Sequence, residues 1–184
     1  TLPREAGLFR GADGQLYLSS TPSPELIALR DKEITKVRNR SIGRKASEFL
    51  LPTSNDGVCE ILLDLDCGKA DSVEMKIANN AGEFVNMTYN SKNHTISFDR
   101  RNSGIVDFSQ DFPAVTVAPS FENSNKVSLR IFIDKSSMEV FGNNGKFAMT
   151  NLVFPTKPYS TLSIAADGGK AKVENLKIYS IKKL

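Results

Sequence analysis

Short runs in which apolar and polar residues alternate recur about every eight to twelve residues along this chain, with turn-forming residues between them. In residues 72–77, for example, Val73, Met75 and Ile77 fall on one face of an extended strand. Asn143-Asn144-Gly145 separates two apolar runs, and Asn-Gly at such a place is the strongest short hairpin signal. The pattern predicts an all-β fold, a two-layer antiparallel β-sandwich whose later strands follow one another as a meander.

The first thirty residues have a different pattern. Residues 8–18 predict a hairpin that turns around Ala12-Asp13-Gly14. Ser23 can cap a helix, Pro24 suits its first position, and residues 25–30 are good helix formers. We therefore expect an N-terminal hairpin followed by a short connector helix of about two turns.

The length of 184 residues fits one domain with a short attached segment. We divide the chain into a lead-in segment and linker over 1–32 and a β-sandwich domain over 33–184. The lead-in segment should leave apolar surface uncovered unless another body covers it. The candidate residues for this surface are Leu2, Leu8, Phe9 and Leu16.

Composition excludes several classes of protein. No run of 18 apolar residues is present, so the sequence predicts no membrane span. Residues 1–5 contain a charge of each sign and no apolar core, which predicts no signal peptide there, and the lack of an initiator Met indicates a mature or excised form. A net charge of +3 is too small to argue for nucleic acid. Tryptophan is absent and His94 is the only histidine, so one chain cannot form a histidine-rich zinc site.

Two sets of side chains could carry chemistry. Asp64 and Asp66 lie on one face of a predicted strand, where paired carboxylates could bind a metal or act as acid and base. We favour a solvated strand face, because nothing nearby supplies further ligands. His94 could be a general base, but we favour a half-buried histidine at a strand end that bonds a turn carbonyl.

The remaining features favour structural interpretations. Cys59 and Cys67 share strand parity and would lie about 26 Å apart on a continuous strand, which predicts free buried thiols. Gly168-Gly169-Lys170 lacks the spacing of a phosphate loop. A stretch of basic residues predicts a solvated edge strand. Because tryptophan is absent, only tyrosines and some phenylalanines could stack on sugars. The basic residues are Lys36, Arg38, Arg40, Arg44 and Lys45, and the tyrosines are Tyr17, Tyr89, Tyr159 and Tyr179.

The run Leu129-Arg130-Ile131-Phe132-Ile133-Asp134-Lys135-Ser136-Ser137-Met138-Glu139-Val140-Phe141, followed by Asn143-Asn144-Gly145, resembles a signature of glycoside hydrolase family 32. This family contains the levanases, inulinases and invertases, which are β-fructosidases, and the resemblance is to their C-terminal, lectin-like β-sandwich module. Shorter stretches agree in order: residues 1–5 with the strand that leaves the catalytic propeller, 25–30 with a connector helix, and 60–65, 100–104 and 173–181 with sandwich strands.

The resemblance implies no catalytic residue in this chain. The family's three catalytic motifs lie in its propeller: Trp-x-Asn-Asp-Pro-Asn-Gly, Arg-Asp-Pro and Glu-Cys. Here Arg30-Asp31 is followed by Lys32, and Cys59-Glu60 has the reverse order. We therefore assign no catalytic, cofactor-binding or metal-binding residue and expect no cofactor.

Three hypotheses follow. The first is a non-catalytic accessory domain of a fructan- or sucrose-cleaving hydrolase, which stabilises the five-bladed catalytic propeller of the same parent chain and contacts a second copy in a homodimer. The second is a lectin-like module that binds fructan itself, and the third a small hydrolase that uses Asp64, Asp66 or His94. We favour the first.

Its partners would be the propeller, a second copy or carbohydrate, with no nucleic acid and no membrane. For the parent we favour a secreted or periplasmic location and keep a cytoplasmic one open.

Overall fold

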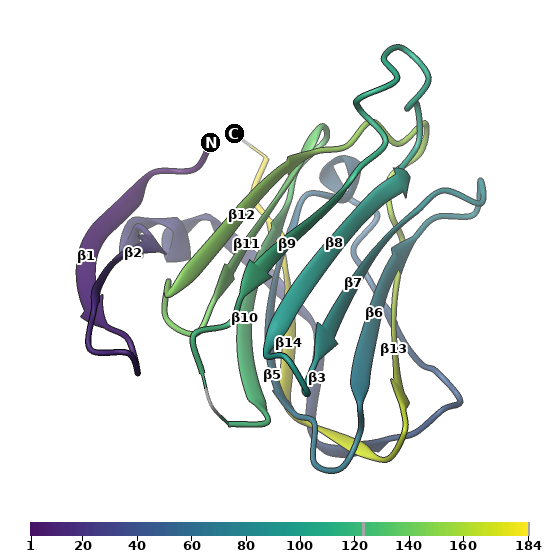
Figure 1. Cartoon of the computed structure of the whole chain (residues 1–184). Helices are drawn as coiled ribbons and strands as arrows, with labels where there is room; N and C mark the ends of the chain where they lie inside the picture. Colours follow the sequence, from purple (N-terminus) through teal and green to yellow (C-terminus); the bar gives the residue numbers. More distant parts are fainter. Residues whose placement is uncertain (123, 184) are drawn as a thin grey trace.

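The computed structural model describes residues 1–122 and 124–183, and its regular secondary structure is almost entirely β-strand. Two six-stranded sheets pack face to face, and a separate two-stranded hairpin stands beside them (Figure 1). Neighbouring strands in all three sheets pair antiparallel. The predicted two-layer antiparallel sandwich is confirmed. No helix within the described residues is long and apolar enough to cross a membrane.

Each sheet mixes strands from distant parts of the chain. The first sheet has the order β12 (Phe147–Leu152), β11 (Ser137–Gly142), β10 (Lys126–Ile133), β5 (Cys59–Asp66), β14 (Ala171–Ile181) and β3 (Arg30–Ile42). The second sheet has the order β4 (Ser47–Leu50), β13 (Thr161–Asp167), β6 (Ser72–Ala78), β7 (Phe84–Asn90), β8 (Thr95–Asn102) and β9 (Val115–Pro119). A short 3-10 turn, η2 (Asn55–Gly57), precedes β5.

The prediction of a simple meander is wrong for the last two strands. Strands β6 to β9 and β10 to β12 do follow one another as neighbours. Strand β13, however, returns to the second sheet between β4 and β6, and β14 enters the first sheet between β5 and β3. Since β14 pairs with strands that come more than a hundred residues earlier, the local alternation of residues could not predict this placement.

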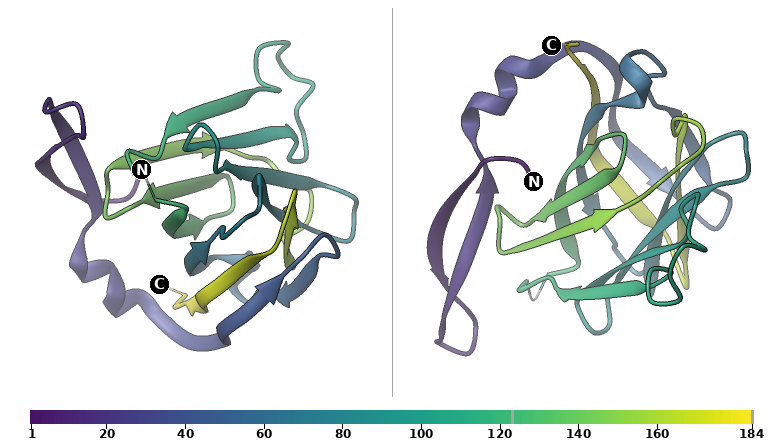
Figure 2. Two further views of the ribbon diagram at one scale, coloured as in Figure 1. Left: turned by 60° about the horizontal axis from the view of Figure 1, so that its bottom comes forward. Right: turned by 90° about the horizontal axis from the view of Figure 1, so that it is seen from above.

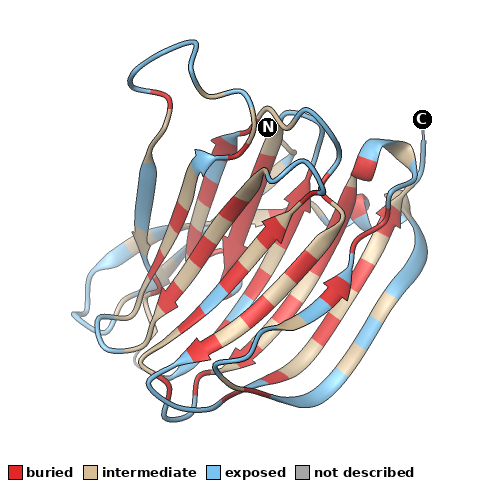
Figure 3. Cartoon of the chain, turned by 90° about the vertical axis from the view of Figure 1, so that its right-hand side faces the viewer, coloured by how far each residue is buried: buried red, intermediate tan, exposed pale blue. Residues whose placement is uncertain are grey.

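The core lies between the sheets, where alternate residues of the central strands are buried (Figure 3). On β5 the predicted inner face, which contains Cys59, Ile61, Leu63 and Leu65, is at most 1% exposed. The predicted inner face of β6 is buried in the same way at Val73, Met75 and Ile77. The period-2 pattern of the sequence thus identified the core.

The lead-in segment lies outside the sandwich (Figure 2). Its hairpin consists of β1 (Arg4–Arg10) and β2 (Leu16–Pro22), as predicted, and a 3-10 helix, η1 (Pro24–Leu29), connects it to β3. Pro24 occupies the first turn as expected, but Ser23 makes no side-chain cap bond to the backbone and instead bonds the Glu25 carboxylate. The proposed boundary between 1–32 and 33–184 stays a prediction, and β3 itself begins at Arg30.

Candidate functional site

The predicted acidic pair does lie on one face of β5, the outer face of the first sheet. Asp64 and Asp66 are both half-buried there. The Asp64 carboxylate accepts a hydrogen bond from Asn175 at 3.3 Å, and that of Asp66 accepts one from the Gly68 backbone N–H at 2.9 Å. Across residues 1–122 and 124–183, no group of three or more His, Cys, Asp or Glu side chains could hold a metal ion.

His94 is half-buried in the turn between β7 and β8, with a positive φ of 50°. Its Nδ1 atom lies 3.2 Å from the Tyr89 hydroxyl, and its backbone carbonyl accepts a hydrogen bond from Ser120. The expected half-buried position is confirmed, although the side-chain partner is a tyrosine hydroxyl where we expected a turn carbonyl. This contact places the imidazole beside the Tyr89 hydroxyl at the end of a strand.

The two cysteines are free and buried, as predicted. Burial raises the pKa of Cys59 to about 12 and that of Cys67 to about 12, because the interior disfavours a thiolate. Both sulfurs are therefore protonated near neutral pH and are poor nucleophiles.

The basic stretch lies on β3, which is an edge strand of the first sheet, and in the turn that follows. Lys36, Arg38 and Arg40 are exposed, so the prediction of a solvated edge strand is confirmed. Tyr89 and Tyr159 are buried and cannot offer a stacking surface to a sugar.

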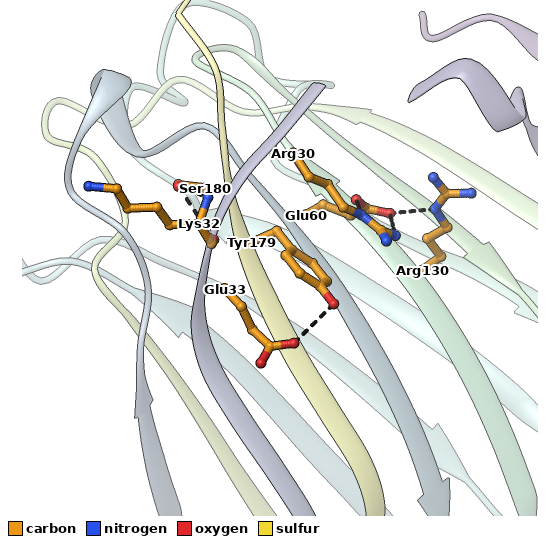
Figure 4. Close-up of polar contacts among 7 residues, drawn as sticks. All are labelled: Arg30, Lys32, Glu33, Glu60, Arg130, Tyr179 and Ser180. Atoms are coloured by element: carbon orange, nitrogen blue, oxygen red, sulfur yellow. Dashed lines mark hydrogen bonds and ion pairs between the residues drawn. The ribbon is translucent and has the colours of Figure 1, made fainter. Parts of the chain in front are cut away.

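A buried carboxylate that the sequence analysis did not single out joins the lead-in segment to the sheet. Glu60 on β5 is fully buried and accepts hydrogen bonds from Arg30 Nε at 2.6 Å and Arg30 Nη2 at 2.8 Å (Figure 4). Arg130 on β10 donates to the same carboxylate from its Nε at 2.6 Å. The hydrogen bond from Arg30 to Glu60 raises the pKa of the Arg30 guanidinium. We call Glu60, Arg30 and Arg130 the Glu60 clamp.

The groups around the clamp also hold the start of β3 in place. The Arg30 guanidinium lies 4.4 Å from the centre of the Tyr179 ring, a cation–π distance. The Tyr179 hydroxyl donates to Glu33 at 3.1 Å, and Ser180 Oγ accepts from the Lys32 backbone N–H at 3.1 Å (Figure 4). These contacts fix the point where the lead-in segment joins the sheet.

A second buried carboxylate, Glu139 on β11, binds the other end of the lead-in segment. It is 3% exposed and pairs with the Arg4 guanidinium. It also accepts a hydrogen bond from the backbone N–H of Leu2 at 2.7 Å. Between the two carboxylates lies an apolar cluster separate from the main core, and it holds η1 and the N-terminus against β10 to β12. The cluster contains Leu26, Phe132 and Phe141, with Leu2, Leu29 and Ala148 packed around them.

The hairpin contacts the sandwich at two further points. The Ser20 N–H donates to the Gly145 carbonyl at 2.8 Å, and a Cβ added at Gly145 would lie 2.5 Å from the Ser20 oxygen. Gly145 also has a φ of +77°, so this position of the β11–β12 turn favours glycine for two reasons. At the second point, the Phe121 ring packs against the hairpin, with its centre 5.3 Å from that of Phe9 and 4.8 Å from that of Tyr17.

The opposite face of the hairpin is apolar and uncovered. Leu8 and Leu18 are direct partners across the hairpin and are 70% and 68% exposed, and Leu16 is 59% exposed. Exposure of Leu8 and Leu16 was predicted. The prediction is wrong for Leu2 and Phe9. The apolar cluster half-buries Leu2, and Phe121 half-buries Phe9. We call Leu8, Leu16 and Leu18 the leucine face.

The candidate site is therefore a hairpin that is anchored to the sandwich and presents the leucine face away from it. Sequence reasoning missed its anchors, because Glu60 and Glu139 lie 30 and 135 residues from the arginines of the lead-in segment that they bind. Glu60 shares the outer face of β5 with Asp64 and Asp66 and gives no signal of its own. Only Glu139, which lies among Met138, Val140 and Phe141, interrupts an apolar run. A charge in such a place is stable only with a partner.

Comparisons with known proteins agree with this architecture. Residues 25–180 match the model of the family described as glycosyl hydrolases family 32 C terminal. A levanase of Bacillus subtilis (strain 168) is 31% identical over 187 residues, which cover 100% of this chain and 27% of the levanase. A levanase of Bacillus sp. (strain L7) is 30% identical, over 98% of this chain and 20% of its own length.

Solved structures show the same fold. The exo-inulinase of Aspergillus awamori aligns over 100% of this chain and 36% of its own chain, with a TM-score of 0.85 and 23% identity. The β-fructofuranosidase of Schwanniomyces occidentalis aligns over 100% of this chain and 40% of its own, with a TM-score of 0.77 and 18% identity. This chain thus spans less than half the length of each of these four proteins. Taken with the family match over residues 25–180, the fold and the sequence show that the chain belongs to the C-terminal domain family of the family 32 glycosyl hydrolases.

Proposed function

We propose that this chain is the non-catalytic C-terminal domain of a fructan- or sucrose-cleaving glycoside hydrolase, and that it stabilises the catalytic propeller through the lead-in hairpin. The observation that carries the proposal is the leucine face, with Leu8 and Leu18 about two-thirds exposed on a hairpin that two buried carboxylates anchor. An anchored hairpin with exposed leucines is suited to contact a second body.

The extent of the matches supports a partner in the same parent chain. The two levanases are matched over only 27% and 20% of their lengths, so most of each lies outside the region that resembles this chain. The anchoring is in keeping with such a role, because a hairpin that is fixed to the first sheet and contacts the propeller would hold the two domains in one relative position. Contact with a second copy, and a secreted or periplasmic location, stay predictions.

The leucine face gives a direct test of this role. In the full-length enzyme, the double substitution Leu8→Ser and Leu18→Ser should lower the temperature of thermal inactivation, because each leucine buried at an interface contributes about 1.5–3 kcal/mol. Leu50→Ser is the matched control, since Leu50 is 71% exposed on β4 of the second sheet. In the isolated chain both variants should unfold like the wild type. Equal inactivation temperatures for the two variants of the full-length enzyme would refute the proposed contact.

A further inference from the structure

The turn between β11 and β12 contains the one Asn-Gly pair of the sequence, Asn144-Gly145. Asn144 is exposed, and its carboxamide makes no hydrogen bond within residues 1–122 and 124–183. Asn143 beside it is 7% exposed and is held at both ends of its carboxamide. Its Nδ2 donates to the Ser120 carbonyl at 2.8 Å, and its Oδ1 accepts from the Ser128 backbone N–H at 3.0 Å. The Asn144 side chain is therefore free to move, whereas that of Asn143 is not.

The backbone nitrogen that follows Asn144 is free as well. The Gly145 N–H donates no hydrogen bond in the part of the chain that the structure describes, although the Gly145 carbonyl accepts one from Ser20. Within the turn, the backbone hydrogen bond from the Lys146 N–H to the Asn143 carbonyl is long, at 3.4 Å. Rotation of the turn can thus bring the Gly145 nitrogen to Cγ of Asn144, and no Cβ on Gly145 obstructs that approach.

A free carboxamide next to a free backbone nitrogen can cyclise. The Gly145 nitrogen attacks Cγ of Asn144 and forms a new C–N bond, while the bond from Cγ to Nδ2 breaks. The proton of the Gly145 N–H ends on the leaving nitrogen, which departs as ammonia. Water then opens the five-membered succinimide at one of its two carbonyls and gives either aspartate or isoaspartate. The reaction needs no oxidant, reductant or enzyme, because the solvent supplies the water.

We propose that Asn144 is a site of this modification, and that its isoaspartate product loosens the lead-in hairpin. Isoaspartate directs the main chain through the side chain and so adds one CH₂ group to the backbone directly before Gly145. Gly145 has no room to move, because its carbonyl lies 2.8 Å from the Ser20 nitrogen and a Cβ on it would lie 2.5 Å from the Ser20 oxygen. An added bond of roughly 1.5 Å is enough to break this hydrogen bond.

The aspartate product differs, since it keeps the length of the backbone and adds only a negative charge. Isoaspartate is therefore the product that should release β2 from the turn. The inference goes beyond the proposed function, because it concerns how the hairpin is attached to the sandwich and not what the leucine face contacts.

The test is to age the 184-residue chain in mildly alkaline buffer, where the backbone nitrogen loses its proton more readily, and to map its peptides by mass spectrometry. We expect a mass gain of one dalton at Asn144, with isoaspartate among the products. Asn80 is the internal control, because it is exposed in the β6–β7 turn but is followed by Ala81, which carries a Cβ. In the aged protein the Ser20 amide should exchange up to about tenfold faster, as expected for the loss of one hydrogen bond.

Asn144→Gly is the control variant, since glycine tolerates the φ of 56° at this position and removes the carbon that the nitrogen attacks. Its Ser20 amide should exchange at the same rate before and after ageing. Two results would overturn the proposal: a mass gain at Asn144 that is no faster than at Asn80, or modified protein in which Ser20 exchanges as in fresh protein. The leucine face plays no part in this experiment, so its result is independent of the proposed contact with the propeller.

Discussion

Arg30 binds both carboxylate oxygens of Glu60, through Nε at 2.6 Å and Nη2 at 2.8 Å, and so ties the end of the lead-in segment to the middle of the first sheet. Glu60 has no exposed surface, so its charge is stable only because Arg30 and Arg130 neutralise and hydrogen-bond it. Loss of one member of a buried pair costs more than the pair itself contributes, because an uncompensated charge stays behind.

Glu60→Gln should therefore lower the free energy of unfolding by about 3–5 kcal/mol, because two guanidinium groups lose their counter-charge. Urea denaturation of the isolated chain measures this change. Glu74→Gln is the control, since Glu74 is a strand glutamate that is exposed on β6, and it should change stability by less than about 0.5 kcal/mol. A Glu60→Gln variant as stable as the control would show that the clamp is unimportant.

Gly145→Ala should release the hairpin. The substitution adds a Cβ at 2.5 Å from the Ser20 oxygen and also places alanine at a φ of +77°. Gly82→Ala isolates the second effect, because Gly82 has a φ of +84° but nothing within 4 Å of the added Cβ. We expect Gly82→Ala to cost about 1–2 kcal/mol and Gly145→Ala to cost more, with faster amide exchange in β2 only for Gly145→Ala. Identical exchange in the two variants would contradict the contact between Ser20 and Gly145.

The buried thiols make stability fall at alkaline pH. Their folded pKa values of about 12 lie above the ordinary value of about 8.5, so between these limits the unfolded state loses protons that the folded state keeps. The contribution of the thiols to the free energy of unfolding is thus fully present below about pH 8.5. Above that pH it decreases by up to about 1.4 kcal/mol per pH unit for each thiol. Cys59→Ala with Cys67→Ala should flatten this decline in urea titrations between pH 8 and 11. An unchanged slope would mean that burial does not raise the pKa values of the two thiols.

The isolated chain should release no fructose from sucrose, levan or inulin above the rate in buffer. Retaining glycosidases need two carboxyl groups about 5 Å apart on either side of the scissile bond. Asp64 and Asp66 instead lie on one face of the same strand, and His94 bonds Tyr89 at the end of another. Fructose release by the purified chain that Asp64→Asn or His94→Ala abolishes would overturn the accessory-domain interpretation.

Local chemistry made much of this fold predictable. The alternation in β5 and β6 and the turn chemistry of the hairpins depend on neighbouring residues, and the free cysteines followed from strand parity. At Asn143-Asn144-Gly145 the turn was predicted, and all three residues have positive φ. The reason for Gly145, which is the approach of Ser20 from the lead-in hairpin, is not local and could not be predicted.

The candidate site was less predictable, because its parts meet only through long-range contacts. The position of β14 between β5 and β3 brings Tyr179 next to Arg30, and the packing of the hairpin on β11 brings Arg4 to Glu139. Neither pairing has a signal in the spacing of the residues. What the sequence did offer was Glu139 within an apolar run, which indicates a buried ion pair but not its partner.

The central claim is that the leucine face of the lead-in hairpin contacts the catalytic domain of the same parent enzyme. Amide hydrogen exchange of residues 4–22, measured in the isolated chain and in the full-length enzyme, tests it most directly. We predict that exchange in β1 and β2 around Leu8 and Leu18 is slower in the full-length enzyme, because the contact protects the hairpin, while exchange in β6 and β7 of the second sheet is the same in both. Equal exchange of the hairpin in the two proteins would contradict the claim.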